Sequence, residues 1–234
     1  CEMAYRLGQA AAIYLGKTIV VGRDTRRSGD MLGAALSAGI MSAGGTVLEA
    51  GIIPTPGVAL LVREMRAAGG AVISASHNPP EYNGYKVYWE DGAQFTPPHD
   101  KGVTEEVLAI EDLSTVKTMS ASDAKAAGLY KVIGAEIDDK YIAHVKAQVV
   151  NQDAIDKMQD DIKIVYTPLH GTGNIPVRRV LKEIGFTHVY VVPEQELPDG
   201  DFPTVSYPNP EAKEAFELGL KLAKEKNADL VLAT

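Results

Sequence analysis

The sequence predicts an α/β protein of two small domains, each with a mixed, mostly parallel sheet flanked by helices. Strand-like and helix-like patterns alternate along the chain, as they do in βαβ units. Polar or glycine-bearing loops follow directly on several apolar strand patterns. Residues 112–135 lack clear periodicity and read as a surface linker or an irregular edge, which divides the 234 residues into two halves. We therefore predict domains at residues 1–137 and 138–234.

In the first half, turn and capping residues separate the predicted elements. Gly16 follows the first helix as a C-terminal glycine does, and Ser28 or Asp30 can cap the second. Gly44-Gly45 ends that second helix, and Asp91-Gly92 is a hairpin turn signal. The predicted elements are helices at 2–15, 31–43, 57–66 and 104–110, strands at 18–21, 46–49 and 70–74, and a hairpin at 85–95.

The second half repeats the rhythm of strand, loop and helix without a detectable sequence repeat. A long loop ends at Pro210, and an apolar run closes the chain. The predicted elements are helices at 138–149, 175–184 and 211–225, and strands at 163–166, 187–192 and 228–234. Because ligands of open α/β sheets bind outside the carboxyl ends of the strands, the loops after these strands are the expected site.

Composition excludes several classes of protein. The 31 acidic and 23 basic residues give a net charge of -8, which argues against a nucleic-acid surface. The single cysteine, Cys1, excludes an intrachain disulfide and fits a reducing compartment. No apolar run approaches the ~20 residues that span a bilayer, and no signal peptide opens the chain. We expect a cytoplasmic protein without a membrane or nucleic-acid partner.

The segment from Gly70 to Pro79 carries the strongest chemical signal. An apolar run stops abruptly at Ser76 and His77, and Pro79 and Pro80 stiffen the loop that follows. A hydroxyl beside an imidazole in a stiff loop indicates preorganised chemistry, although such a serine can also simply form a turn. His77 could act as a general acid or base, bind a phosphate oxygen, or satisfy a backbone carbonyl. On an extended chain, neighbouring side chains point opposite ways, so His77 could fall short of the Ser76 oxygen.

Three cationic or imidazole side chains are candidates for binding a substrate phosphate. Arg23 and Arg26 follow a strand end, where a guanidinium can pair with phosphate. The alternative is an ion pair that braces the loop, which we prefer for Arg23 and leave open for Arg26. His170 lies in a second glycine-bearing loop, residues 168–174, that lacks the lysine and spacing of a P-loop. It could contact a ligand or be structural.

Five segments occur in the order and spacing of one enzyme family. They are Val21-Gly22-Arg23-Asp24-Thr25-Arg26, Gly70 to Pro79, Asn83-Gly84-Tyr85-Lys86, Asp199-Gly200-Asp201-Phe202-Pro203 and Pro208-Asn209-Pro210-Glu211. Together they resemble the α-D-phosphohexomutases, the phosphoglucomutase/phosphomannomutase family, and are most similar to its bacterial phosphoglucomutases. The resemblance covers nearly the whole chain and implies that the two halves are the family's first and second domains.

The resemblance implies an activity and the residues that perform it. It implies an intramolecular phosphotransferase that interconverts hexose 1-phosphate and hexose 6-phosphate through a phosphoserine at Ser76 and a bisphosphorylated sugar. His77 would assist at the same loop. Lys86, which on composition alone would be a solvated surface lysine, would lie at the active site and stabilise the transferring phosphoryl group.

The resemblance also implies groups beyond these residues. The family binds Mg²⁺ through an Asp-Pro-Asp-x-Asp-Arg loop that would begin where this chain stops, at Ala233-Thr234. Only Ser76, through its phosphate, would then serve as a metal ligand. A glucose 1,6-bisphosphate-type activator and the C-terminal domains of the same protein are further expected partners. Since the chain opens inside an apparent helix and closes on a strand, we expect a fragment with little mutase activity alone.

Two other functions remain open at this point. The chain could be a non-catalytic phosphosugar-binding or regulatory module derived from the family. It could also be a hydrolase that uses Ser76 as nucleophile and His77 as base, although no Gly-x-Ser-x-Gly elbow is present.

Overall fold

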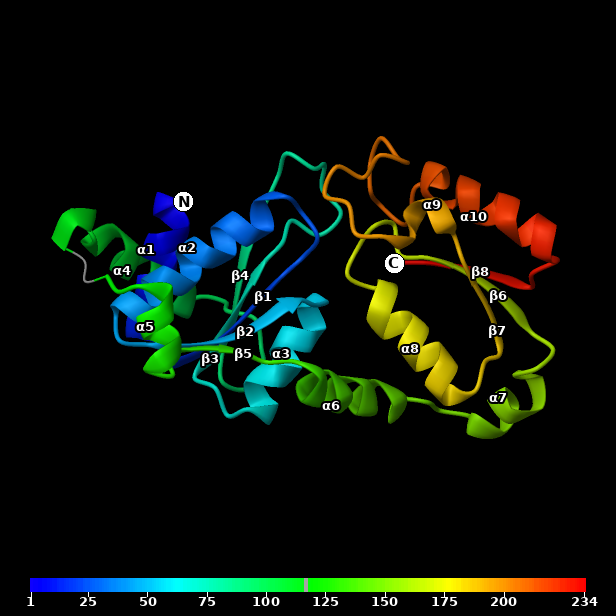
Figure 1. Cartoon of the computed structure of the whole chain (residues 1–234), viewed down its shortest axis with the longest axis horizontal. Coiled ribbons are helices and arrows are strands. Elements are labelled where there is room, and N and C mark those ends of the chain that lie inside the picture. Colours follow the sequence, from blue (N-terminus) through cyan, green and yellow to red (C-terminus); the bar gives the residue numbers. More distant parts are fainter. Residues whose placement is uncertain (116–117) are drawn as a thin grey trace. The chain divides into compact units, whose positions relative to one another are not determined.

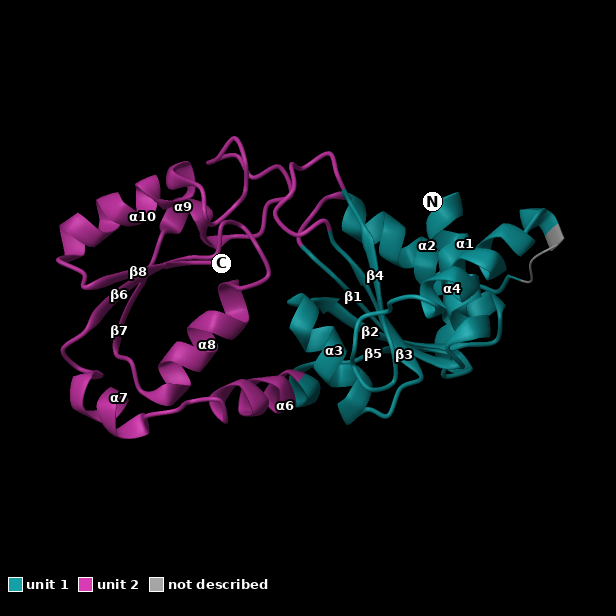
Figure 2. Cartoon of the chain, turned by 180° about the vertical axis from the view of Figure 1, so that it is seen from behind, with its two compact units in different colours: residues 1–24, 28–74, 83–137 teal, residues 25–27, 75–82, 138–234 magenta. Residues whose placement is uncertain are grey.

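The chain divides into two compact units, which are coloured separately in Figure 2. The structure is a computed structural model that describes residues 1–115 and 118–234. The first unit comprises residues 1–24, 28–74 and 83–137, and the second comprises residues 25–27, 75–82 and 138–234. Two short pieces from the first half of the sequence therefore belong to the second unit. One of these pieces, residues 75–82, carries the serine loop.

A five-stranded sheet with the order β4-β3-β1-β2-β5 forms the centre of the first unit (Figure 1). Only β4 runs antiparallel to its neighbour, and the other pairings are parallel. The strands are β1 Thr18–Arg23, β2 Thr46–Ile52, β3 Gly69–Ile73, β4 Tyr85–Tyr88 and β5 Tyr130–Val132. The helices are α1 Glu2–Tyr14, α2 Ser28–Ser42, α3 Thr55–Glu64, α4 His99–Ala109, η1 Leu113–Thr115 and α5 Ala121–Ala126, and α6 Ala135–Lys146 begins here.

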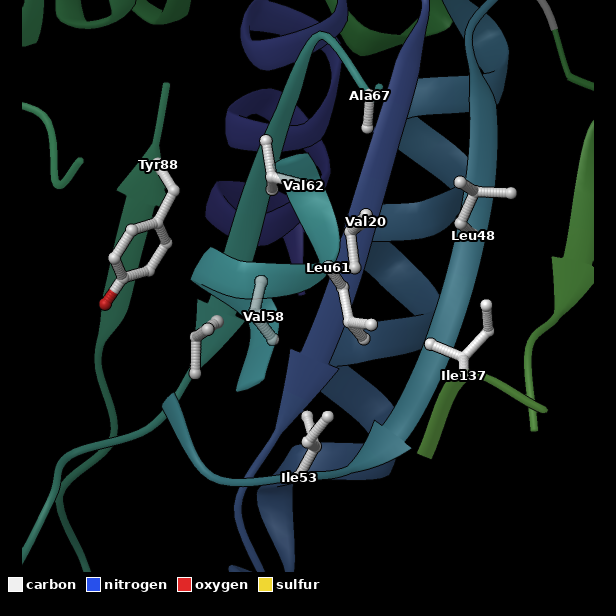
Figure 3. Close-up of a cluster of buried hydrophobic side chains, with 10 residues drawn as sticks. Val20, Leu48, Ile53, Val58, Leu61, Val62, Ala67, Tyr88 and Ile137 are labelled. Atoms are coloured by element: carbon white, nitrogen blue, oxygen red, sulfur yellow. The ribbon is translucent and has the colours of Figure 1, made fainter. Parts of the chain in front are cut away.

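Strand β1 is buried on both faces of this sheet. Its alternate residues enter different hydrophobic clusters, as the two-residue period of a strand requires. Val20 packs with Val58 and Leu61 of α3, as Figure 3 shows. Ile19 and Val21 point the other way, into a cluster that includes residues of α1 and α2. Two helical layers therefore cover the sheet, which explains why β1 and β3 read as continuous apolar runs.

A three-stranded parallel sheet with the order β7-β6-β8 forms the second unit, with α8 and α10 on opposite sides of it in Figure 1. Gly219 lets α10 lie directly on the sheet, because a Cβ there would meet Val231. The strands are β6 Lys163–Thr167, β7 His188–Val191 and β8 Leu230–Ala233. The helices are α7 Gln152–Met158, α8 Asn174–Ile184, α9 Pro193–Glu196 and α10 Lys213–Lys226.

The predicted α/β class is confirmed, and the differences lie in short or polar elements. Residues 112–135, predicted as a surface linker or an irregular edge, contain η1, α5 and the edge strand β5, and residues 116–117 lie outside the described residues. The N-cap Ser120 accepts a hydrogen bond from the Asp123 amide and starts α5, and β5 adds an edge strand beside β2. A helix of six residues and a strand of three are too short to show periodicity.

Other boundaries differ because polar first turns carry no apolar period. Helix α4 begins at His99 rather than at residue 104, and α7 and α9 were not predicted. The predicted hairpin is present, but its second arm is not a full strand: after β4, a single antiparallel bridge joins Tyr88 to Gln94. In the part of the chain that the structure describes, no helix combines the length and apolar character needed to cross a membrane.

Candidate active site

The serine loop begins where β3 ends at its carboxyl end. Ser74 and Ala75 are still buried, whereas Ser76 and His77 are exposed. Ser76 has a φ of 55°, a left-handed conformation that residues with a Cβ adopt only when their surroundings impose it. The loop therefore projects a hydroxyl into solvent from a backbone that is held in an unfavourable conformation.

The left-handed turn at Ser76 brings its side chain to the neighbouring imidazole. Ser76 Oγ lies 3.2 Å from His77 Nδ1. The expectation that His77 could fall short of this oxygen is wrong, because it assumed an extended chain and the backbone turns here. The hydroxyl and the imidazole are thus close enough to share a proton.

Arg26 organises the backbone of this loop. Its guanidinium donates to four carbonyl oxygens, which belong to Ser76 at 2.9 Å, Asn78 at 2.7 Å, Pro79 at 2.7 Å and Tyr82 at 3.1 Å. The residue is only 3% exposed. Since a buried charge is tolerated only where polar groups surround it, these carbonyl dipoles and the guanidinium stabilise one another. The contacts support a role for Arg26 in shaping the loop.

Residues 199–202 pack against the same arginine. The ring of Phe202 lies with its centroid 5.4 Å from the Arg26 guanidinium carbon, within cation–π range. A Cβ at Gly200 would meet the backbone of Arg26 and Arg27, and Asp201 pairs with Arg27. Phe202 lies within one of the five family segments, but no local pattern predicts its role, because its contact with Arg26 joins residues far apart in sequence.

Arg23 is braced between two carboxylates of the first unit. Its guanidinium lies 2.9 Å from Glu49 and 2.6 Å from Asp30. Burial raises the pKa of the Glu49 carboxyl above 4.5, and the nearby Arg23 charge lowers it only in part. This is the bracing arrangement that the sequence analysis preferred for Arg23.

Lys86 lies on β4 of the first unit, opposite Val72 of β3 and half-buried. Opposite residues of an antiparallel pair share a face of the sheet, so Lys86 is on the face that Val72 and Tyr88 share with α3. Lys86 therefore lies at the end of β4 that pairs with the carboxyl end of β3.

His170 belongs to a buried polar network of the second unit. It is 3% exposed, and its two ring nitrogens lie 3.0 Å from the Leu197 carbonyl oxygen and 3.0 Å from Thr204 Oγ1. Because a carbonyl only accepts, Nδ1 donates to Leu197. Gln195 completes the network by donating to Thr204 at 3.1 Å. Both nitrogens are therefore engaged within the unit, which favours the structural alternative for His170.

The described residues do not form a magnesium site. Among residues 1–115 and 118–234, no group of three or more His, Cys, Asp or Glu side chains is placed to hold a metal ion. Ser76 contributes at most one oxygen. The described residues therefore do not fit a complete Mg²⁺ site.

Comparison with known families agrees with this geometry. Residues 1–114 match the model of the phosphoglucomutase/phosphomannomutase alpha/beta/alpha domain I, and residues 139–234 match that of domain II. The chain belongs to the phosphoglucomutase/phosphomannomutase family. The resemblance carried by the five sequence segments is thereby confirmed.

Individual members of the phosphoglucomutase/phosphomannomutase family show the same similarity. A protein of Haemophilus influenzae named "Probable phosphomannomutase" is 37% identical over 92% of this chain and 43% of its own length. The glucose 1,6-bisphosphate synthase of Mus musculus is 40% identical over 78% of this chain and 29% of its own length. A crystal structure from Thermus thermophilus, assigned as a phosphomannomutase, covers 99% of this chain and 50% of its own, with a TM-score of 0.80 and 25% identity.

This family member thus spans half or less of the length of the relatives to which it is compared. Relatives with different names, a mutase and a synthase of a sugar bisphosphate, match the same region. The matched region therefore identifies the family without distinguishing its substrates.

Proposed function

We propose that this chain is the phosphoserine-bearing part of a hexose phosphate mutase, with Ser76 as the phosphoryl carrier. The observation that supports this most strongly is the Ser76 loop: an exposed hydroxyl, a left-handed backbone and a buried arginine that organises four loop carbonyls. An ordinary surface turn needs no such support. Membership of the phosphoglucomutase/phosphomannomutase family supports phosphoryl transfer as the chemistry of this loop.

The proposed reaction is two phosphoryl transfers. In the first, a hydroxyl of the hexose phosphate attacks phosphorus, a new P–O bond to the sugar forms and the bond to Ser76 Oγ breaks. The sugar hydroxyl loses its proton, and Ser76 Oγ regains one. In the second, Ser76 Oγ attacks the other phosphoryl group of the bisphosphate, which leaves the isomeric hexose phosphate and restores phosphoserine. Such transfers depend mainly on positioning and on charge stabilisation.

The candidate side chains have distinct proposed roles. His77 Nδ1, 3.2 Å from Ser76 Oγ, is placed to exchange a proton with that oxygen as it gains or loses the phosphoryl group. Lys86 stabilises charge on the transferring group. Arg26 shapes the loop, and Arg23 is held by Glu49 and Asp30 at the end of β1. His170 acts through the loop at 195–204 rather than on the substrate.

Mg²⁺ and a sugar bisphosphate activator belong to this proposal as well. A metal ion, when bound, would neutralise charge on the phosphoryl group. Among the described residues, phosphorylated Ser76 would offer it one oxygen ligand. The bisphosphate would load Ser76 with its first phosphoryl group and would be released as hexose monophosphate.

Intact-protein mass spectrometry tests the carrier role directly. We expect the protein, incubated with glucose 1,6-bisphosphate and Mg²⁺, to gain the mass of one phosphoryl group, and fragmentation to place that group on Ser76. Ser76→Ala should abolish the gain. Ser74→Ala, which alters a buried serine two residues away, is the matched control and should retain it. Phosphorylation that persists in Ser76→Ala would refute the assignment, and a trapped acyl group would favour a hydrolase.

A further inference from the structure

Phe202 is buried beside Arg26 and has no role in the proposed chemistry. It is 6% exposed, adopts a left-handed φ of 49° and places its ring centroid 5.4 Å from the Arg26 guanidinium carbon. Large hydrophobic residues rarely accept a left-handed backbone unless the surrounding structure holds them there. The surrounding residues of the second unit therefore fix the position of the Phe202 ring.

We propose that Phe202 is a positioning residue for Ser76, which acts by holding the Arg26 guanidinium in the orientation that gathers the carbonyls of the serine loop. The inference about loop geometry stands on the contacts alone. Its consequence for phosphoryl transfer rests on the proposed function of Ser76.

The geometry of a guanidinium explains why a ring and four carbonyls can share it. Its N–H groups donate in the plane, and Arg26 uses Nη1 and Nη2 for two carbonyls each. Its two faces carry no donors, and an aromatic ring can cover one of them. Phe202 can therefore hold the plane of the guanidinium without competing for its hydrogen bonds, and fixing that plane fixes where the carbonyls must lie.

Phe202 is itself anchored to the core of the second unit. Its amide donates to Asp199 at 3.3 Å, and the Asp199 amide donates to the His170 carbonyl at 3.4 Å. Two residues after Phe202, the Thr204 hydroxyl forms hydrogen bonds with both His170 and the fully buried Gln195. The ring is thus fixed from both flanks by a buried polar network. This gives His170 a function in the site that needs no contact with substrate.

Amide hydrogen exchange measures the loop without requiring catalysis. The Asn78 amide donates to Ala75 at 3.1 Å and the Tyr82 amide donates to Pro79 at 3.1 Å, so both report on the serine loop. In Phe202→Leu, we expect exchange of these two amides to be about tenfold faster, the size of effect that loss of a desolvated cation–π contact can produce. The Val192 amide, bonded to Tyr166 in the sheet, should be unchanged.

Controls separate positioning from loss of stability. Phe95→Leu removes a half-buried ring of the first unit and should leave the two loop amides unchanged. Phe202→Tyr keeps the ring and should restore slow exchange. Arg26→Lys and the double variant complete a mutant cycle, in which Phe202→Leu should add little once the guanidinium is gone. Additive effects, or equal acceleration at Val192, would overturn the proposal.

Phosphoryl transfer in the complete protein supplies the functional measurement. With glucose 1,6-bisphosphate, we expect Phe202→Leu to slow loading of Ser76 about tenfold at saturation while the half-saturating concentration stays the same. Phe202→Tyr should recover the rate. A normal loading rate in Phe202→Leu would overturn the positioning role. If the unaltered protein never loads Ser76, the proposed function fails, and the exchange measurement still decides whether Phe202 positions the loop.

Discussion

At the scale of single residues, the serine loop is held by one buried charge whose partners are backbone carbonyls. Arg26 donates to four of them, and its guanidinium carbon lies 5.4 Å from the centroid of the Phe202 ring. This arrangement leaves the exposed Ser76 hydroxyl beside His77 while the backbone that carries it is fixed. Hydrogen bonds from Arg26 therefore restrain the backbone from Ser76 to Tyr82, as a preorganised site requires.

Replacing Arg26 by lysine should be costly although the charge is retained. An ammonium group cannot place paired donors in one plane, so some of the buried carbonyls would lose their partner. We expect the free energy of unfolding of Arg26→Lys to fall by about 2–4 kcal/mol, measured by urea denaturation. The matched control is Arg27→Lys, an exposed arginine that pairs with Asp201, which should change stability by less than about 0.5 kcal/mol. Equal losses of unfolding free energy in the two variants would contradict the proposed role of the Arg26 guanidinium in holding the loop carbonyls.

The buried Glu49 predicts a specific pH dependence. Its pKa in the folded protein is raised above 4.5, chiefly by burial, so the folded state binds its proton more tightly than the unfolded state does. Stability from this group is therefore present below pH 4.5 and is lost as the pH rises through the folded pKa. We expect the unaltered protein to lose stability relative to Glu49→Gln over this rise, measured by urea denaturation at a series of pH values. A difference that grows in favour of glutamate would show that the Arg23 pair outweighs burial.

At the scale of elements, the crossing of α1 and α2 depends on two glycines. A Cβ at Gly8 would overlap the Leu36 carbonyl, and a Cβ at Gly39 would overlap the Tyr5 carbonyl. The two backbones thus approach without intervening side chains. Helix α2 also begins two residues after Arg26, so the position of this helix bears on the loop that precedes it.

Adding a methyl group at this crossing should force the helices apart. We expect Gly8→Ala or Gly39→Ala to lower the free energy of unfolding by about 1–3 kcal/mol or more, despite the better helix propensity of alanine. Gly134→Ala is the control, because its Cβ would meet open space. Its stability should be unchanged or slightly raised. Thermal or urea denaturation compares the three, and a neutral Gly39→Ala would mean that the helices slide without cost.

Elements with a strong apolar pattern were predicted from the sequence, and short ones were not. β1 and β3 are buried on both faces, so their continuous apolar runs gave their positions to within two residues. α5 and β5 carry six and three residues, too few for a period to appear. α4 starts with His99-Asp100-Lys101-Gly102, a polar turn that packs through Gly102 against Tyr14. A contact of that kind is invisible to local patterns.

At the scale of the whole molecule, the chain contains the first two domains of the phosphoglucomutase/phosphomannomutase family. The chain covers 43% of the Haemophilus influenzae relative and 50% of the Thermus thermophilus structure. Within its described residues it offers no cluster of metal-binding side chains. Loading of Ser76 and repeated turnover are therefore separate properties that can be measured separately.

We expect the 234 residues alone to show little or no mutase turnover. Phosphoryl transfer depends on charge stabilisation around the whole phosphoryl group, and the longer relatives contain as much chain again. A coupled assay with glucose 1-phosphate and mannose 1-phosphate, run on this chain and on the complete protein with Ser76→Ala as blank, measures the difference. Turnover of this chain near that of the complete protein would contradict the expectation.

The candidate site could be predicted where its reactive side chains are adjacent in the sequence. Ser76 and His77 stand side by side in the sequence, and the stiffening prolines mark their loop. Their 3.2 Å contact was not predictable, because it depends on a left-handed φ that tertiary contacts impose. The Arg26–Phe202 contact could not be predicted either, because no local pattern links two residues that lie far apart in the sequence.

The membership of residues 25–27 and 75–82 in the second unit has a consequence for biosynthesis. During translation, the strand that leads to Ser76 can pair with its neighbours long before Phe202 leaves the ribosome. Until then Arg26 lacks its contact with the Phe202 ring. We therefore expect the serine loop to reach its final conformation only after most of both units have been synthesised.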